Sequence, residues 1–364
     1  MVAVAAAHVI TPTQTLSPGV VDIDESSGAI VDIAPTRGSV PDLVLAPGFV
    51  DIQVNGIDDV DVAHATGGDW ERLDELLAAQ GTTSWCPTLV TAPLASYGPR
   101  IASVADAQTR HAACPSIIGA HLEGPFLGGA PGAHRRELII EPDLEWIASL
   151  PDVVILTTLA PEASNAVDAI EVFRDRGVVV SLGHSTATAA QSGDAVDAGA
   201  RLVTHLYNGM GALHHREPGL LGTALTDDRL TASIIADLVH VHPAAIRLAF
   251  AAKPHQMVLV TDAVAWRRGA VGDTPLRVVD GAPRLVDGTL AGSVLTMDTA
   301  VGNVVNRCGV SLEHAIRSAS TTPAALLGLA DRGAIEVGRR ADLVALDGDL
   351  RCAATWIGGT AVHG

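Results

Sequence analysis

The segment Val258-Leu259-Val260-Thr261-Asp262 is a short apolar run that ends in a carboxylate, and similar runs recur along the chain. Each run is followed by a polar stretch long enough for a helix. Eight runs can be counted, at residues 49–54, 82–90, 116–122, 153–159, 178–182, 202–206, 231–236 and 257–260. Their spacing of about 25 to 35 residues fits one strand and one helix each, and eight such units close a barrel. We therefore predict an α/β fold, a (β/α)₈ TIM barrel over residues 47–330.

The stretches between the runs have the periodicity of helices. In residues 70–80 and 165–176, apolar side chains recur at i, i+3 and i+4, which is typical of helices that bury one face. Apolar residues make up 48% of the chain and aromatic residues 3%, a composition that suits buried parallel strands covered by helices. A chain of 364 residues holds a barrel of about 250 residues and one smaller unit.

Both ends of the chain follow a different pattern. Residues 2–45 contain short Val- and Ile-rich segments broken by prolines and glycines, which predicts strands and turns. The tail repeats this pattern, and we predict two further short strands at 333–338 and 341–346. We expect residues 1–46 and 331–364 to form one small β-sandwich subdomain. The apolar start lacks the basic region and cleavage pattern of a signal peptide, so we interpret it as a strand.

The charge and the cysteines limit the partners and the compartment. A formal charge of −18 argues against nucleic acid and against an anionic membrane, because both partners require a basic surface. The cysteines have no close pair, which predicts reduced thiols and a cytoplasmic location; they are Cys86, Cys114, Cys308 and Cys352. An anionic substrate would need a few cationic groups placed locally against the overall negative charge.

Catalytic groups of (β/α)₈ barrels lie at the carboxyl ends of the strands. Polar side chains that suit a metal site follow six of the predicted strands: Gln53 and Asn55, Glu123, His184, His205, His240, and Asp262. Glu123, His184 and His205 offer one carboxylate and two imidazoles, a three-ligand set that leaves a position of a divalent ion open for water. Alone, each of the three would be interpreted as a capping or hydrogen-bonded core residue.

Asp262 is the candidate proton carrier of this predicted site. A water bound to a divalent ion has its pKa lowered to about 7, and a nearby carboxylate can accept its proton and later deliver it to a leaving nitrogen. The structural alternative is that Asp262 caps the next helix.

Nine motifs in order make the chain resemble the N-acetylglucosamine-6-phosphate deacetylases of the amidohydrolase superfamily. A single motif is weak, whereas nine in order are specific, and together they cover nearly the whole chain. They are Pro47-Gly48-Phe49-Val50-Asp51-Ile52-Gln53-Val54-Asn55-Gly56, His121-Leu122-Glu123-Gly124-Pro125-Phe126, Gly132-Ala133-His134, Gly183-His184-Ser185, Thr204-His205-Leu206-Tyr207-Asn208-Gly209-Met210, Arg216-Glu217-Pro218-Gly219, Asp237-Leu238-Val239-His240-Val241, Val260-Thr261-Asp262-Ala263 and Leu290-Ala291-Gly292-Ser293.

The resemblance implies hydrolysis of N-acetyl-D-glucosamine 6-phosphate to D-glucosamine 6-phosphate and acetate, in amino-sugar catabolism and cell-wall recycling. Glu123, His184 and His205 would hold one Zn²⁺, Asp262 would be the general base and then acid, and His134 would polarise the acetamide carbonyl. The substrate contacts would be Ala133, His134, Asn208, Gly209, Arg216, His240, Ala291 and Gly292. The resemblance also implies a homodimer in which Arg216 reaches the neighbouring site. Without it, His134 and Arg216 would be interpreted as surface-loop residues.

Two features of the sequence bear on the number of metal ions: the residues at the end of the first strand and the position of the one lysine. Many amidohydrolases carry a His-x-His pair where this chain has Gln53 and Asn55, which are poor zinc ligands and become candidates for water-mediated or second-site contacts. A carboxylated lysine bridges two ions in several relatives, but the one lysine here, Lys253, lies before the eighth strand, at the wrong end of the barrel. We therefore expect one metal ion per chain, with a weak second metal site as the alternative.

Two alternatives compete with a deacetylase. Another N-acyl or cyclic-amide hydrolase on the same barrel would give no reason for Arg216-Glu217-Pro218-Gly219 beside Asn208 and His240. A regulatory protein that kept the barrel and lost its chemistry would lack a ligand or the base, and none is missing.

Overall fold

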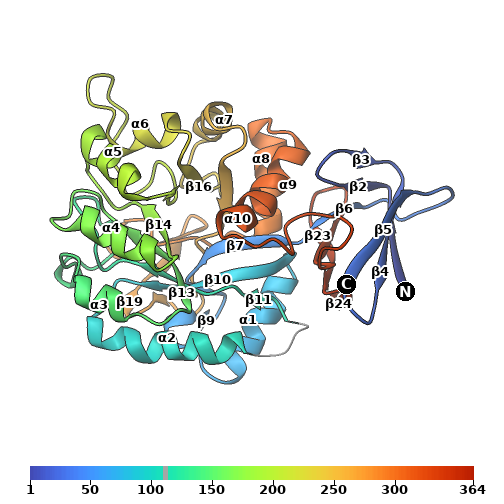
Figure 1. Cartoon of the computed structure of the whole chain (residues 1–364), viewed down its shortest axis with the longest axis horizontal. Coiled ribbons are helices and arrows are strands. Elements are labelled where there is room, and N and C mark those ends of the chain that lie inside the picture. The colour runs from blue at the N-terminus through green and yellow to red at the C-terminus, as the bar shows by residue number, and fades with distance from the viewer. Residues whose placement is uncertain (110–113) are drawn as a thin grey trace.

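A computed structural model describes residues 1–109 and 114–364. Its centre is a nearly closed barrel of eight parallel strands, which confirms the predicted fold (Figure 1). In barrel order, the strands are β7 (Phe49–Val54), β10 (Thr82–Val90), β12 (Ala120–Glu123), β13 (Val154–Leu159), β14 (Val179–Leu182), β15 (Leu202–Val203), β16 (Thr231–Ile235) and β17 (Met257–Val260). The first and last strands meet beyond β17, through a bridge between Val54 and Ala263.

Two of the predicted strands differ from the observed ones. The run 116–122 is divided into β11 (Ser116–Ile117), which pairs with the start of β10, and β12, which pairs with its end. The run 202–206 forms a strand only at Leu202–Val203. Its end leaves the ladder because His205 has a φ of +28°, which is incompatible with a β conformation.

Helices cover the outside of the barrel (Figure 1). The predicted helices 70–80 and 165–176 correspond to α1 (Gly68–Ala78) and α4 (Ala166–Asp175). In α4 the buried residues Ala166, Ala169, Ile170 and Phe173 follow the spacing of one helical face. The other α-helices are α2 (Leu94–Gln108), α3 (Leu144–Ser149), α5 (Ala189–Ala198), α6 (Gly219–Thr226), α7 (Pro243–Ala252), α8 (Met297–Cys308), α9 (Leu312–Ala319) and α10 (Thr321–Leu326).

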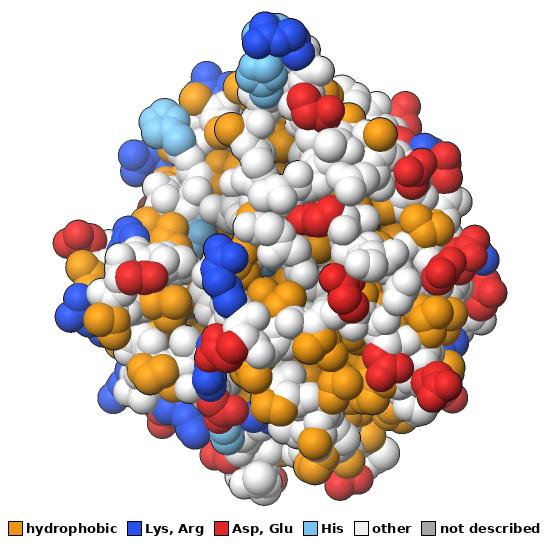
Figure 2. Space-filling model, turned by 90° about the vertical axis from the view of Figure 1, so that its left-hand side faces the viewer, with side chains coloured by type: hydrophobic (Ala, Val, Ile, Leu, Met, Phe, Trp, Pro, Cys, Tyr) orange, Lys and Arg blue, Asp and Glu red, His pale blue; other side chains and the backbone are white. Residues whose placement is uncertain are grey.

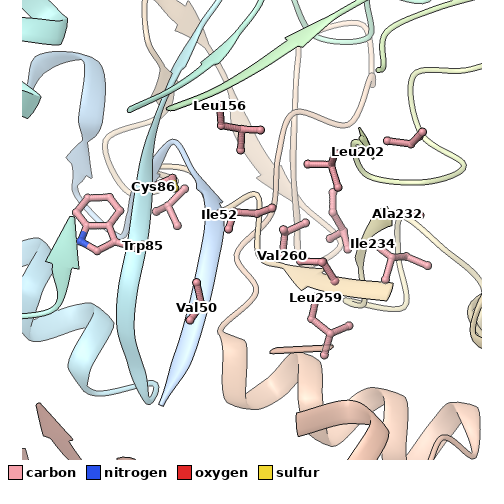
Figure 3. Close-up of a cluster of buried hydrophobic side chains, with 14 of the residues drawn as sticks. Val50, Ile52, Trp85, Cys86, Leu156, Leu202, Ala232, Ile234, Leu259 and Val260 are labelled. Carbon is pink, nitrogen blue, oxygen red and sulfur yellow. The ribbon is translucent and has the colours of Figure 1, made fainter. Parts of the chain in front are cut away.

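The barrel and its helices share one large hydrophobic core. Figure 3 shows part of it, where Val50 and Ile52 of β7 lie near Leu259 and Val260 of β17. These side chains are at most 1% exposed. Full burial of an aliphatic side chain of this size contributes about 1.5–3 kcal/mol, so the core holds the strand ends, and the polar groups on them, in fixed positions.

The two termini meet in two sheets beside the barrel (Figure 1). One sheet contains β1 (Val2–Ala6), β4 (Gly19–Asp24) and β5 (Ala29–Pro35). The other contains β24 (Thr360–His363), β23 (Cys352–Ile357), β22 (Leu343–Leu346), β6 (Val44–Pro47), β2 (His8–Ile10) and β3 (Thr15–Leu16). A second hydrophobic core lies between them and includes Val9, Ile23 and Leu343.

The strand predicted at 333–338 is wrong. Gly333 and Gly338 have φ values of +79° and +88°, a left-handed conformation that interrupts a strand. The segment forms turns, and its Ile335 still packs into the core between the terminal sheets. None of the helices in residues 1–109 and 114–364 combines the length and the apolar character that a membrane crossing requires.

Candidate active site

The residues predicted at strand ends gather at one end of the barrel. Glu123 ends β12, while His184, His205 and Asp262 each lie two residues beyond β14, β15 and β17. His184, His205 and Asp262 have φ values of +50°, +28° and +48°. A positive φ is unfavourable for residues with a Cβ and is concentrated at functional sites, where the surrounding structure enforces it. Here it marks the point at which each chain turns out of its strand.

Glu123, His184 and His205 bring three ligand atoms together. Glu123 Oε1 lies 3.1 Å from His184 Nε2 and 3.0 Å from His205 Nε2, and the two Nε2 atoms are 3.0 Å apart. Ligand atoms around a tetrahedral zinc, with bonds of about 2.0–2.1 Å, lie about 3.3 Å from one another. The spacing therefore suits one ion of this size.

The opposite nitrogen of each imidazole shows which atoms would face an ion. His184 Nδ1 lies 3.2 Å from the Ala130 carbonyl oxygen, and His205 Nδ1 lies 3.1 Å from that of Asn208. A carbonyl accepts only, so each Nδ1 carries a proton, and Nε2 is the atom of each ring that could bind an ion. Two such nitrogens and a carboxylate oxygen converge on one point. The residues thus fit a divalent metal.

His134 lies beside this cluster. Its Nδ1 is 2.8 Å from Thr91 Oγ1, and its Nε2 is 3.8 Å from Glu123 Oε2. The ligand atoms of Glu123, His134 and His184 also lie within 4.8 Å of one another, so His134 is a rival third ligand. The shorter contacts of His205 favour His205. Burial, and then the neighbouring His184, lower the pKa of His134 to about 3, so its ring is neutral.

Asp262 is a buried carboxyl held by two amides. Its Oδ1 accepts from Asn55 Nδ2 at 2.7 Å and from Gln53 Nε2 at 3.3 Å. Burial raises the pKa of Asp262 to about 8, and the nearby Glu123 carboxylate adds to the increase. Asn55 Oδ1 is buried without a hydrogen-bond partner among the described residues. The two polar residues predicted after the first strand therefore contact the carboxyl group.

A cavity of about 370 Å³ opens above these groups, within the usual range for small-molecule sites. Its lining includes every predicted substrate contact except Arg216, together with Asn55, Glu123, His184, His205 and Asp262. His240 Nδ1 lies 2.7 Å from Asp237 Oδ2, which fixes the ring. Burial alone would raise the pKa of Asp237, but the hydrogen bond from His240 brings it below its ordinary value.

Arg216 lies outside this cavity. It is exposed on the loop between β15 and α6, which extends away from the barrel in Figure 1, and its Nη1 lies 2.9 Å from His215 Nε2. Figure 2 shows basic and histidine side chains at the tip of a protrusion. Within one chain, Arg216 is therefore not brought to the other predicted site residues.

One wall of the cavity comes from a segment that the sequence did not single out. Val271, Thr274 and Arg284 line it from two small hairpins, β18 (Ala270–Val271) with β19 (Thr274–Pro275), and β20 (Arg277–Val279) with β21 (Ala282–Arg284). The turn of the first hairpin is tied to β9 (Val60–Asp61), because the Gly272 N–H donates to Asp61 Oδ2 at 2.7 Å.

Charged groups strengthen this attachment. Asp273 lies 3.0 Å from His64 Nε2 and 2.9 Å from Arg100 Nη2. His64 Nδ1 also lies 2.9 Å from Asp61 Oδ1, so both ring nitrogens face carboxylates. Arg135, from the loop after β12, adds a second cation to the cavity lining beside Arg284. Because these partners are about two hundred residues apart, no local pattern could have revealed them.

Comparisons with known proteins agree with this geometry. Residues 44–362 match the model of the amidohydrolase family. The N-acetylglucosamine-6-phosphate deacetylase of Bos taurus is 40% identical over 344 residues, covering 88% of this chain and 83% of the relative. The N-acetylgalactosamine-6-phosphate deacetylase of Escherichia coli O157:H7 is 38% identical over 348 residues, covering 92% of each.

Solved structures give the same result. A variant of the Mycobacterium smegmatis N-acetyl-D-glucosamine-6-phosphate deacetylase, in complex with N-acetyl-D-glucosamine 6-phosphate, superposes with a TM-score of 0.92 at 32% identity, covering 100% of this chain and 99% of that one. The Thermotoga maritima enzyme of the same name also gives a TM-score of 0.92 at 32% identity, covering 99% of each chain. The chain therefore belongs to the amidohydrolase family and, within it, to the N-acetylglucosamine-6-phosphate deacetylases.

Proposed function

We propose that this chain hydrolyses the amide of N-acetyl-D-glucosamine 6-phosphate, in amino-sugar catabolism and cell-wall recycling, and releases acetate and D-glucosamine 6-phosphate. The observation that carries the proposal is the convergence of Glu123, His184 and His205 at 3.0–3.1 Å, beside the buried carboxyl of Asp262. A family match over residues 44–362 and relatives near 40% identity support the substrate.

The proposed cofactor is one Zn²⁺ held by Glu123, His184 and His205. When bound, it would supply Lewis acidity, which lowers the pKa of a water molecule to about 7 and polarises the amide carbonyl. Gln53 and Asn55 already donate to carboxylates through their amides, so they are poor candidates to hold a second ion. One ion per chain is therefore the proposed content.

Asp262 is the proposed proton carrier. The amides of Asn55 and Gln53 both donate to Oδ1, so Oδ2 is the oxygen available to the attacking water. In its carboxylate form, Asp262 accepts the proton of that water and then donates it to the leaving nitrogen, which becomes the amine of the product. The neutral His134 ring is proposed to donate a hydrogen bond to the acetamide oxygen as negative charge develops there.

The substrate contacts are proposed on the cavity lining. The backbone of Ala133, Ala291 and Gly292 would contact the sugar, while Asn208, Gly209 and His240 would hold the phosphate. Arg216 would complete the phosphate site of a second copy of the chain, because it is exposed and turned away from its own cavity. A guanidinium suits a phosphate, since it can donate two parallel hydrogen bonds. The proposed assembly is therefore a homodimer.

Two further assignments accompany the function. We propose a cytoplasmic enzyme, and we propose that residues 1–46 and 331–364 act as one subdomain next to the barrel of residues 47–330. The pairing of β6 with both β2 and β22 supports this division, because it joins the two ends of the chain in one sheet.

N-acetylgalactosamine 6-phosphate is a second candidate substrate, favoured by the Escherichia coli relative that matches over 92% of both chains. The test is acetate release from N-acetylglucosamine and N-acetylgalactosamine, each with and without the 6-phosphate, before and after chelation. The proposal expects turnover of the glucosamine 6-phosphate substrate that chelation abolishes and Zn²⁺ restores. Turnover that is independent of the phosphate or of the metal would refute it.

A further inference from the structure

The side chain of Gln53 joins the two acidic groups of the site to a threonine. Its Nε2 lies 3.0 Å from Glu123 Oε1 and 3.3 Å from Asp262 Oδ1. Its Oε1 accepts a hydrogen bond from Thr204 Oγ1 at 2.8 Å. Gln53 and Thr204 are 2% and 1% exposed, so water competes little for these bonds.

The direction of this amide decides its effect on both carboxylates. The nitrogen and oxygen ends of a glutamine amide have nearly the same shape, so packing alone does not distinguish them. With Nε2 towards Glu123 and Asp262, the amide donates to two acceptors. Rotated by half a turn, it would place a carbonyl oxygen against both. The two acidic groups favour the first orientation, and the hydrogen bond from Thr204 at the opposite end keeps the amide in place.

Thr204 is itself held in one rotamer. A Cβ placed at Gly183 would lie only 2.3 Å from Thr204 Cγ2, so the glycine provides the space that this methyl group fills. The Thr204 N–H donates to the Leu182 carbonyl at 3.0 Å, which fixes the backbone. With the methyl packed against Gly183, the hydroxyl is directed at Gln53.

We propose that Thr204 is a positioning residue that holds the Gln53 amide in place, with its nitrogen towards both the metal-binding carboxylate of Glu123 and Asp262. The inference rests on the proposed function for the roles of those two acidic groups. Thr204 contacts neither substrate nor metal in this assignment and acts through Gln53. Groups that orient metal ligands in this way typically change metal affinity or activity about 10- to 100-fold when they are replaced.

The test is a double-mutant cycle with two readouts. Thr204→Val keeps the methyl group and removes the donor, Thr204→Ser keeps the donor, and Gln53→Leu removes the amide. Zn²⁺ titration of each metal-free protein, with a competing chelator, gives the dissociation constant. Acetate release gives kcat and KM. Thr204→Val should weaken Zn²⁺ binding and lower kcat, each by about tenfold or more, while KM changes by less than about twofold. Thr204→Ser should restore both.

The cycle separates an effect through Gln53 from a general structural effect. In the Gln53→Leu background, Thr204→Val should cause no further loss, because the group that it orients is gone. Thr157→Val is the matched control, since it removes a buried hydroxyl whose partner is the Leu122 carbonyl at 3.3 Å. It should leave Zn²⁺ affinity and kcat near those of the parent.

Two results would overturn the inference. One is a Thr204→Val protein with unchanged Zn²⁺ affinity and kcat. The other is a double variant whose losses are the product of the single ones. Failure of the proposed function can be distinguished from failure of this inference. A parent that releases no acetate from any N-acetylhexosamine phosphate still has a Zn²⁺ affinity, and the cycle can be measured on that affinity alone.

Discussion

The proposed sharing of one site between two chains predicts that two inactive variants will rescue each other. Arg216→Ala removes a side chain that lies outside its own cavity, whereas Asp262→Asn removes the proposed proton carrier inside it. Each homodimer then has the same lesion in both sites. A hybrid dimer has one site with both lesions and one site with neither, because the cavity and the phosphate arginine come from different chains.

The expected recovery follows from counting sites. Equal amounts of the two variants, reassembled at random, give about half hybrids, so about a quarter of all sites are intact. Loss of the Asp262 carboxylate should lower kcat by roughly 10³-fold. Loss of one charged hydrogen-bonding partner of the phosphate costs about 1.5–3 kcal/mol, or roughly 10- to 150-fold at low substrate. The mixture should therefore reach about a quarter of parent activity, well above the sum of the two variants.

Acetate release at substrate concentrations far below KM is the assay, because phosphate binding limits the rate there. Native mass spectrometry gives the fraction of hybrids, and each variant reassembled with itself is the control. The shared-site assignment is refuted if hybrids form and activity stays at the sum of the two parents. Arg216 would then act within its own chain or not at all.

Three further predictions concern the metal, the proton carrier and the barrel. Elemental analysis of protein purified without added metal should find about one divalent ion per chain, and two tightly held ions would contradict the single site. Asp262→Asn should keep that ion and lose roughly 10³-fold in kcat, whereas near-normal kcat would exclude Asp262 as the carrier. Burial raises the pKa of Asp51 to about 7 from 3.8, so the folded state holds an extra proton between these values and loses stability as the pH rises through them. Between pH 4 and pH 8, the free energy of unfolding of Asp51→Asn, measured with denaturant, should rise by up to ~4 kcal/mol relative to that of the parent. Parallel pH dependences of the two proteins would refute the raised pKa of Asp51.

The barrel was predictable because its strands are continuous apolar runs of the length that a parallel strand needs. The runs at Phe49–Val54, Thr82–Val90 and Met257–Val260 match their strands to the residue. The prediction was less successful where backbone conformation opposes the pattern. At 202–206 the strand ends after Val203 because His205 turns out of the ladder, and at 333–338 two glycines interrupt a run that otherwise resembles a strand.

The sequence predicts a site residue only where that residue lies at the end of a predicted strand. Glu123 and Asp262 stand at the ends of apolar runs, so the barrel geometry places them together without further information. Thr204 directly follows β15, but nothing local indicates that its hydroxyl meets Gln53, which is 151 residues away. The wall formed by Val271, Thr274 and Arg284 depends on a hairpin whose anchor lies more than two hundred residues earlier in the chain. Such pairs are decided by tertiary packing, which a local pattern does not encode.

The net negative charge of the chain is compatible with the proposed anionic substrate, because the effect of a charge on a phosphate decreases with the distance between them. Charges separated by more than about 8 Å are largely screened at physiological ionic strength, so most of the net charge of −18 acts weakly on a phosphate inside the cavity. The nearby groups decide its binding: the lining includes the cations Arg135 and Arg284, and a second copy of the chain is proposed to add Arg216. The acidic groups of the lining, Glu123 and Asp262, are assigned to the metal and to proton transfer. A few local cations therefore affect the binding of the proposed substrate more than the net charge of the chain does.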